Sequence, residues 1–311
     1  MEKPIVKIEN VSHRYSVQWA IRDINFEIPT RGIYGLLGSN GAGKSTLMNI
    51  LCGVLRQTEG DIFIKGINTK ENSVAAKRLI GFLPQKPPLH MDLTIEEFLY
   101  HCAGIRLMPD SEIPGAVENA LTECGLLHFR NRLIRNLSGG YQQRVGIAQA
   151  IIHSPELIVF DEPTNGLDPN QIVEVRKLIK EIAEERAVML STHILSEVQV
   201  TCERVMMIEK GHLFFSGTME DFDNQIVPDT LVVMMEQAPS EQELLAIPGI
   251  TRVIAVTAKK YRMFFDEDQQ LVAQRFIETS VAKGWGLTEI AIERSSLDAI
   301  FAKLSGKEIL G

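Results

Sequence analysis

The sequence predicts an α/β fold for most of the 311-residue chain, followed by a small α+β domain. Three observations predict it. An apolar run leads into a glycine-rich loop and then into a helical segment at residues 32–53. Two further apolar runs, 157–160 and 188–191, are typical of strands buried on both faces of a parallel sheet. Beyond residue 229, segments of strand and helix character alternate in a way that indicates a separate unit.

The N-terminal part shows the pattern of a small antiparallel β subdomain joined to the core. Residues 5–9 and 24–28 alternate apolar and polar side chains, as half-buried antiparallel strands do. Residues 32–38 are expected to form the strand that enters the glycine loop. The segment 47–53 has the apolar spacing of a helix and ends on Gly53, which suits a helix stop.

An inserted helical subdomain is expected between the two halves of the core, at about residues 87–150. From Thr94 the pattern is helical to about residue 133, and Thr94 with Glu97 fits a capping box at a helix start. The core then resumes with the first of the two apolar runs. A helix over 169–185 is expected to separate that run from the second one.

The last third of the chain is predicted to be an accessory domain with a ferredoxin-like fold. Residues 220–229 contain several Asp residues and a Pro, and we interpret them as a linker between a first domain, 1–219, and a second, 230–311. The expected order β-α-β-β-α-β is that of a split βαβ unit. The expected strands are 230–236, 251–257, 260–265 and 287–293, the expected helices are 240–246 and 267–283, and a last helix is expected at 296–304.

Composition and charge limit the possible partners. Hydrophobic residues make up 45% and charged residues 23%, as in an ordinary globular protein, and the net charge is −8. This acidic balance argues against nucleic acid as a partner, since an electrostatic grip on phosphates usually needs a basic face. The four cysteines form no C-x-x-C pair, which predicts reduced and mostly buried thiols. No apolar run approaches the roughly 18 residues of a membrane-spanning helix, so no segment is expected to cross a bilayer as a helix.

Gly38-x-x-x-x-Gly43-Lys44-Ser45 matches the phosphate-loop pattern in full. Its glycines allow successive N–H groups to turn inward and form an anion-binding nest at a helix N-terminus. Lys44 is expected on the β- and γ-phosphates, Ser45 on Mg²⁺ and Thr46 on the α-phosphate. The alternative is a glycine-rich turn with an exposed lysine, which the flanking strand and helix disfavour. The residues expected to hold the nucleotide are Gly38, Ser39, Asn40, Gly41, Ala42, Gly43, Lys44, Ser45 and Thr46.

Asp161 and Glu162 follow directly after the apolar run 157–160. Ligands of open α/β sheets bind outside the carboxyl ends of the strands, where these two carboxylates emerge. We expect Asp161 to hold Mg²⁺ through water. We expect Glu162 to act as the general base that accepts a proton from an attacking water. A pair of solvated acids at the start of a loop is the alternative, and the nearby phosphate loop weighs against it.

Residues 137–144 read Leu-Ser-Gly-Gly-Tyr-Gln-Gln-Arg. Together with the phosphate loop before it and the acidic pair after it, this element makes residues 4–218 resemble the ATP-binding cassette (ABC) ATPases. The resemblance implies a phosphate-loop NTPase core that binds and hydrolyses ATP. It also implies that Ser138, Gly139 and Gly140 contact the γ-phosphate of ATP held by a second subunit. A homodimer with two sites is therefore expected.

Three further positions take a role from the same resemblance. Gln85 would contact Mg²⁺ and water, Asp168 would lie in the loop that touches the opposite site, and His193 would hydrogen-bond the γ-phosphate. Considered singly, Gln85 and His193 are more typical of a loop amide and a structural histidine at a strand end. Their order along the chain relative to the phosphate loop and the acidic pair favours the functional reading.

Tyr15 matches the aromatic residue that stacks on adenine in ABC ATPases, and it lies in the expected place ahead of the phosphate loop. Base–aromatic stacking adds affinity and tolerates varied geometry. Tyr15 could equally pack on the small antiparallel sheet, and Trp19 is the competing aromatic residue.

These motifs predict an ATPase, but they do not indicate which process its ATP hydrolysis drives. The first hypothesis is a transporter subunit, peripheral on the cytoplasmic face of the cell membrane, that docks through its helical subdomain onto a separate membrane permease. Residues 165–169 and 296–301 resemble the ATPases of bacterial ABC-2 type exporters, which include drug and antibiotic efflux and gliding-motility systems. The alternative is a soluble mechanical ATPase of DNA repair or translation, although the chain lacks the long coiled coil, zinc-binding cysteines or second cassette of those relatives. An ATP-gated binding module without turnover is disfavoured by Glu162.

Overall fold

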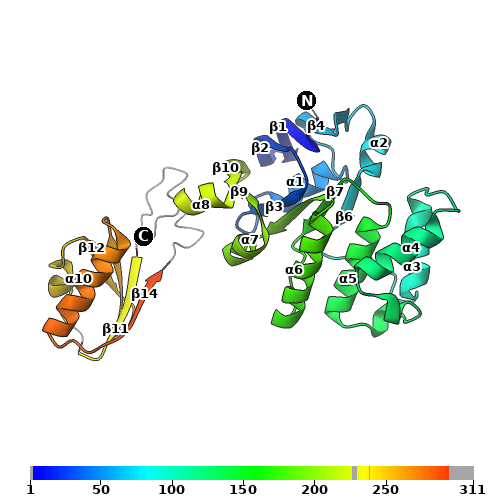
Figure 1. Ribbon diagram of the computed structural model, residues 1–311. Helices are drawn as coiled ribbons and strands as arrows, with labels where there is room; N and C mark the ends of the chain where they lie inside the picture. The colour runs from blue at the N-terminus through cyan, green and yellow to red at the C-terminus, as the bar shows by residue number, and fades with distance from the viewer. Residues whose placement is uncertain (1–2, 226–229, 238, 294–311) are drawn as a thin grey trace. The chain divides into compact units, whose positions relative to one another are not determined.

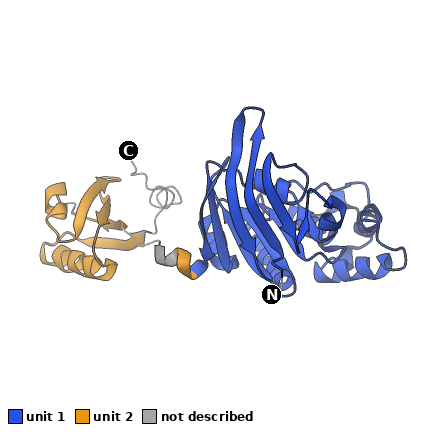
Figure 2. Cartoon of the chain, turned by 90° about the horizontal axis from the view of Figure 1, so that it is seen from above, with its two compact units in different colours: residues 1–219 blue, residues 220–311 orange. Residues whose placement is uncertain are grey.

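The computed structural model describes residues 3–225, 230–237 and 239–293. The chain divides into two compact units, residues 1–219 and 220–311 (Figure 2). The larger unit contains two sheets with helices, and the described part of the smaller unit contains one sheet with helices (Figure 1). Each unit has a hydrophobic core of its own. Within the described residues, no helix combines the length and the apolar character needed to cross a bilayer.

One sheet of the larger unit is antiparallel and has the strand order β2-β1-β4-β5. Its first two strands pair from Val6↔Ile28 to Tyr15↔Gln18, so the hairpin extends well beyond the two short strands expected from sequence. Register shifts along this pairing break the alternation of apolar and polar residues. The sequence therefore shows the strand pattern only at the end of the hairpin that lies farthest from its turn. The strands are β1 (Val6–Tyr15), β2 (Gln18–Ile28), β4 (Glu59–Ile64) and β5 (Ile67–Asn68).

The second sheet has six strands in the order β10-β9-β3-β8-β7-β6. All its neighbouring strands are parallel except the β9–β10 pair. Every residue of β3, β7 and β8 is buried, which is why these strands appear in the sequence as continuous apolar runs. The strands are β3 (Gly32–Leu37), β6 (Ile80–Leu83), β7 (Leu157–Asp161), β8 (Ala187–Thr192), β9 (Arg204–Glu209) and β10 (His212–Thr218).

The helices begin and end at recognisable signals. The first helix starts at Lys44, three residues before the predicted start, because Gly43 caps it with a φ of 110°. Thr94 and Glu97 form both hydrogen bonds of the predicted capping box. The helices of the larger unit are α1 (Lys44–Leu51), α2 (Ser73–Arg78), α3 (Ile95–Ile105), α4 (Ile113–Glu123), α5 (Gly139–Ile151), α6 (Pro169–Ala183) and α7 (Leu195–Thr201).

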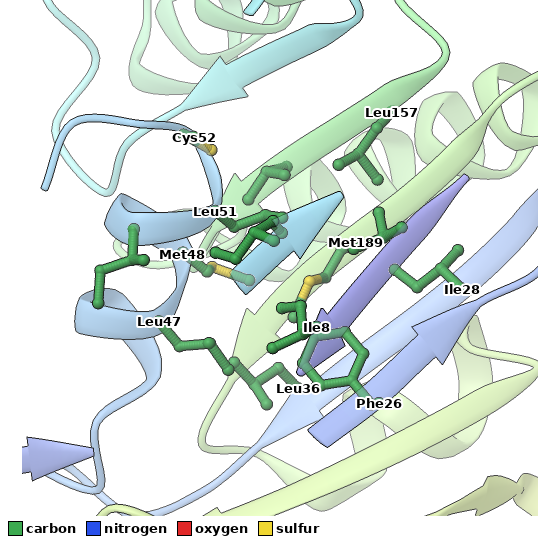
Figure 3. Packing of buried hydrophobic residues seen from close by; sticks show 14 of the residues in the cluster. Ile8, Phe26, Ile28, Leu36, Leu47, Met48, Leu51, Cys52, Leu157 and Met189 are labelled. Carbon is green, nitrogen blue, oxygen red and sulfur yellow. The ribbon is translucent and has the colours of Figure 1, made fainter. Parts of the chain in front are cut away.

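Helix α1 is fixed by the main hydrophobic core. Met48 and Leu51 of this helix are fully buried, in a cluster that also contains Ile8 of β1, Phe26 of β2 and Met189 of β8 (Figure 3). Removing large side chains from such a core costs about 2–5 kcal/mol each. The core therefore holds the N-terminus of α1, and with it the glycine loop, in a defined place.

The smaller unit confirms the predicted β-α-β-β-α-β order up to its last described strand. Its antiparallel strands have the order β12-β13-β11-β14, which is that of a ferredoxin-like fold. Phe276 and Trp285 are buried in its core. The expected last helix, 296–304, lies outside the described residues. The elements are β11 (Thr230–Met235), α9 (Glu241–Leu245), β12 (Ile250–Ala255), β13 (Lys260–Phe265), α10 (Gln269–Ala282) and β14 (Leu287–Glu293).

The stretch 220–229, predicted to be a linker, begins with a helix. Helix α8 (Met219–Gln225) occupies its first part, and residues 226–229 lie outside the described residues. Glu220 and Asp221 lie in the first turn, where negative charge is favourable to the helix dipole. Phe222 is fully buried, which anchors the helix.

Candidate nucleotide-binding site

The glycine loop lies between β3 and α1, and its backbone needs glycine at defined positions. Gly41 and Gly43 have φ values of 82° and 110°, in the region that residues with a side chain rarely adopt. A Cβ on Gly38 would lie 2.3 Å from the carbonyl oxygen of Ile208 in β9. The loop therefore runs close against the neighbouring strand at Gly38, where a side chain would clash, and a side chain at Gly41 or Gly43 would strain the backbone.

Lys44 lies folded back over this loop. Its side chain is only 5% exposed, and its Nζ donates hydrogen bonds to the carbonyl oxygens of Gly38 at 2.9 Å and Ser39 at 3.0 Å. Burial lowers the pKa of this ammonium group, and the carboxylates of Glu162 and Asp161 oppose that effect. The positive charge is thus held at the mouth of the loop, beside acceptors that ligand oxygens can replace.

Glu162 collects hydrogen bonds from three other segments. Its Oε2 accepts from Gln85 Nε2 at 3.0 Å and from Asn165 Nδ2 at 3.2 Å. Its Oε1 lies 3.2 Å from His193 Nδ1 and 3.8 Å from Lys44 Nζ. Glu162 also has a φ of 50°, a strained backbone conformation of the kind found at functional sites. The structure therefore brings together five side chains, Glu162 and its four neighbours, whose sequence positions span more than half of the larger unit.

Asp161 is held separately from its neighbour. It is buried, and its Oδ1 accepts a hydrogen bond of 2.6 Å from Ser191 Oγ. The same hydroxyl accepts from the backbone N–H of Glu162 at 2.9 Å. Ser191 in β8 thereby fixes both acidic residues at the carboxyl end of β7.

A cleft of about 660 Å³ opens along the glycine loop. Tyr15 and Trp19 lie on its wall, and Tyr15 is 52% exposed with the ring of His13 against it in an edge-on contact. The ring of Trp19 is engaged by the guanidinium groups of Arg14 and Arg22 at 5.6 and 5.0 Å. Of the two aromatic residues, Tyr15 is thus the one with more of its surface open. The cleft is lined by Tyr15, Gln18, Trp19, Ala20, Asn40, Gly41, Gly43, Lys44, Ser45, Thr46, Gln85, Glu162 and Lys210.

The residues expected to contact ATP held by a second subunit lie elsewhere in the larger unit. Ser138, Gly139 and Gly140 form the start of α5, and none of the three is among the described residues that line the cleft. Ser138 is the N-cap of α5, yet its hydroxyl makes no capping hydrogen bond. Gly140 also has a packing role, because a Cβ there would lie 2.8 Å from the side chain of Gln171 in α6. The hydroxyl of Ser138 is not committed to its own helix.

Asp168 has a structural role in this chain. It is the N-cap of α6, and its Oδ1 accepts from the backbone N–H groups of Asn170 and Gln171, both at 3.0 Å. Replacing such a cap by alanine costs about 0.5–2 kcal/mol. The loop that Asp168 ends is also tied to α5, where Gln143 Nε2 donates to the carbonyl oxygen of Pro163 at 2.7 Å.

Three residues of the site were not singled out from the sequence. Asn165 and Ser191 stood inside recognised motifs, and the available signal was a polar side chain in the loop after β7 for Asn165 and near the end of β8 for Ser191. Glu209 accepts a 2.6 Å hydrogen bond from Ser39 Oγ of the glycine loop. It ends β9, a strand that the sequence analysis did not identify, so its place beside the loop could not be inferred.

The residues expected to hold Mg²⁺ offer suitable atoms. Ser45, Gln85 and Asp161 present hydroxyl, amide and carboxylate oxygens, the ligand types that Mg²⁺ prefers. Among the described residues, no group of three or more His, Cys, Asp or Glu side chains could hold a metal by itself.

A glycine loop between a buried strand and a helix, with acidic residues at the end of a neighbouring parallel strand, defines a phosphate-loop nucleoside triphosphatase. The ABC transporter family profile matches residues 21–165. The bacitracin transport ATP-binding protein BcrA of Bacillus licheniformis is 38% identical over 211 residues, 67% of this chain and 68% of that protein. The linearmycin resistance ATP-binding protein LnrL of Bacillus subtilis (strain 168) is 27% identical over 309 residues, 98% of this chain and 99% of that protein.

A solved structure shows the same fold. The ATP-binding cassette MJ0796, a dimer in a post-hydrolysis state bound to ADP and Pi, is 28% identical with a TM-score of 0.61, and the match covers 69% of this chain and 98% of that one. The chain therefore belongs to the ABC transporter family and is an ATP-binding subunit of such a transporter. As an ABC ATPase it binds ATP.

Proposed function

We propose that this chain hydrolyses ATP with Mg²⁺ at a site completed by a second copy of itself, and that this cycle drives export through a separate membrane permease. The observation that carries the proposal is the convergence of Lys44, Gln85 and His193 on Glu162 beside the glycine loop. These are the charged and polar groups that phosphoryl transfer needs around the γ-phosphate and its attacking water.

ATP would lie in the cleft with its adenine on Tyr15 and its phosphates in the glycine loop. The exposed ring of Tyr15 offers a stacking surface at one end of the cleft. The N–H groups of residues 39–46 and the dipole of α1 favour the phosphates at the other end. The oxygens of the β- and γ-phosphates would replace the loop carbonyls that Lys44 now contacts.

Ser45, Gln85 and Asp161 are the side chains that would hold Mg²⁺, directly or through water. Bound Mg²⁺ supplies neutralisation of the charge that develops on the phosphate oxygens. Ser191 positions Asp161 for this task, because its hydroxyl fixes one carboxylate oxygen of Asp161 and leaves the other to bind water.

Glu162 is the proposed general base. With its two oxygens engaged by Gln85, Asn165 and His193, it is held in place but not free to accept a further proton. A γ-phosphate would compete for His193 and Lys44, since both are donors that bind anionic oxygens. Their transfer to the phosphate would free Oε1 of Glu162 to face the attacking water.

A second copy would complete the cage around the γ-phosphate. One subunit supplies Lys44 and His193, which both lie against Glu162, whereas Ser138 and Gly140 do not line its cleft. The Ser138 hydroxyl and the N–H groups at the start of α5 form a second donor set at a helix N-terminus. Contact of this set with ATP held by the partner would make ATP binding and dimer closure one event, and hydrolysis would release it.

Docking on a membrane subunit is supported by a second cavity of the larger unit. This groove, of about 800 Å³, lies among α2, α3 and β6. It is lined by apolar side chains that are well exposed, among them Val54, Val74, Ile105 and Leu107. Clustered apolar exposure of this kind is typical of an interaction site. We propose that a short helix of the permease occupies it, which would place the chain on the cytoplasmic face of the membrane.

The permease contact can be tested by co-expression with a multi-span membrane partner, followed by membrane flotation. Ile105→Asp should move the chain from the membrane fraction to the soluble fraction while its ATP turnover in solution stays near that of the wild type. Val281→Asp is the matched control, since Val281 is a similarly exposed apolar residue on α10 of the smaller unit. A wild-type chain that stays soluble beside every such partner would contradict the transporter proposal and favour a soluble mechanical ATPase.

A further inference from the structure

Glu197 is a buried carboxylate that has no role in the hydrolysis proposed for the glycine-loop site. It lies in the first turn of α7 and is only 6% exposed. Its Oε2 accepts from Thr192 Oγ1 at 2.7 Å, and its Oε1 accepts from Thr164 Oγ1 at 2.8 Å and from Arg176 Nη2 at 3.2 Å. A buried charge is retained at a cost unless it is paired and hydrogen-bonded, and here both oxygens are satisfied.

The three donors come from the turn of His193, from the loop that follows Glu162 and from helix α6. Thr192 immediately precedes His193, and its hydroxyl also accepts from the backbone N–H of Ile194 at 3.1 Å. The residues on either side of His193 are therefore linked through the Thr192 hydroxyl. Thr164 lies in the loop between Glu162 and Asp168. Arg176 lies on α6, the helix that Asp168 caps.

We propose that Glu197 is a positioning residue that couples the His193 turn to the loop 163–168. This inference rests on the proposed function. When His193 shifts toward a γ-phosphate, the Thr192 hydroxyl moves with it, and the shared carboxylate transmits that movement to Thr164. Contact with ATP in one site and contact with the second subunit through the 163–168 loop thereby change together.

The carboxylate is the group that can make this link. Its two oxygens accept on opposite sides at once, whereas glutamine has one acceptor oxygen and an NH₂ that would face a hydroxyl or a guanidinium group. A purely structural clamp would behave differently from a coupling residue. Loss of a clamp lowers the melting temperature alone, and loss of coupling lowers kcat while ATP affinity is kept.

The test uses Thr164→Val in the full-length chain, because it removes one hydroxyl and leaves Arg176 paired with Glu197. We expect kcat to fall about tenfold, the size of effect for one hydrogen bond to a charged group, with ATP affinity of the monomer within about twofold of the wild type. Thr164→Ser, which keeps the hydroxyl, should restore most of kcat. Unchanged kcat with a lower melting temperature would overturn the proposal, as would an equal loss of kcat and ATP affinity.

A double variant adds an independent measure. Since Thr164 and Thr192 act through one carboxylate, Thr164→Val and Thr192→Val together should lower kcat less than the product of their separate effects. Glu123→Gln is the matched control, because it disturbs an Arg–carboxylate pair with Arg186 away from the site, and its kcat should stay near wild type. Multiplicative effects of the two valines would contradict coupling.

Failure of this inference is distinguishable from failure of the proposed function. If Glu162→Gln forms ATP-dependent dimers and Thr164→Val leaves kcat unchanged, the inference alone is wrong. If Glu162→Gln forms no dimers with ATP, the proposed closure is wrong, and the coupling proposal falls with it.

Discussion

Nδ1 of His193 lies 3.2 Å from Oε1 of Glu162, the same oxygen that lies 3.8 Å from the ammonium group of Lys44. One carboxylate oxygen thus faces both of the donors proposed for the γ-phosphate. Phosphate oxygens would compete with this carboxylate for both donors, so the proposed base is freed by the substrate on which it acts.

Lys44→Ala should abolish measurable ATP binding and lower turnover by about 100-fold or more, since it removes the charge that the glycine loop holds for the phosphates. Fluorescent-nucleotide titration and a phosphate-release assay measure the two effects. The variant should stay folded, because Lys44 Nζ bonds only to backbone carbonyls and its nearest charge, at 3.8 Å, is on a carboxylate with other donors. Normal turnover would refute the phosphate-loop assignment.

Glu162→Gln should lower hydrolysis by about 10²–10⁴-fold, the range for loss of a general base, and leave ATP binding intact. Because ATP then persists in the closed state, light scattering with ATP should detect a particle of twice the monomer mass. Without nucleotide the mass should return to that of the monomer. A variant that hydrolyses ATP at the wild-type rate would remove Glu162 from the base role.

Two substitutions of Asp168 separate its role as a helix cap from a contact with the partner subunit. Asp168→Ala should lower the free energy of unfolding by about 0.5–2 kcal/mol, whereas Asp168→Asn should lower it little, because asparagine caps helices as well as aspartate does. Denaturant unfolding measures both. If the carboxylate also contacts the opposite site, Asp168→Asn should weaken ATP-dependent dimers at nearly unchanged stability. Equal destabilisation by both substitutions would contradict the capping assignment.

The buried cysteines should react slowly with alkylating reagents in the folded chain. Burial raises the pKa of the Cys202 thiol to about 12, and it raises that of Cys124 as well. A raised thiol pKa means less thiolate at neutral pH, and the thiolate is the reactive form. Mass spectrometry after iodoacetamide treatment should show both unmodified at pH 7.5 and modified after unfolding. Rapid labelling of either in the folded chain would contradict their burial.

The sequence was most informative for two of the strands buried in the core, although it missed β9, whose four central residues are also buried. All residues of β7 and β8 are buried, so their apolar runs indicated parallel core strands directly. β10 alternates between exposed and half-buried residues over most of its length, and it was missed. The acidic residues of α8 suit a loop as well as a helix N-terminus, so the sequence alone does not reveal this helix.

The site was predictable as a set of residues but not as a network. The phosphate loop and the acidic pair are each recognised from a short stretch of sequence, because neighbouring residues determine their conformation and chemistry. The contact of Ser39 with Glu209 joins residues 170 positions apart, and that of Thr164 with Glu197 joins residues 33 apart. Contacts of this kind depend on strand order in the sheet, which no single segment specifies. Likewise, only the structure shows that Ser138 leaves its hydroxyl uncommitted at the start of α5.

Complementation between two inactive variants decides whether Ser138 acts on ATP held by the partner subunit. Lys44→Ala and Ser138→Ala should each be inactive as homodimers, because every site then lacks one essential group. If Ser138 acts on ATP held by its partner, equal mixing should restore about a quarter of wild-type turnover, since half of the randomly paired dimers contain one intact site of two. The phosphate-release rate of the mixture measures this. A mixture as inactive as either variant alone would show that Ser138 serves the site of its own chain, and would contradict the account.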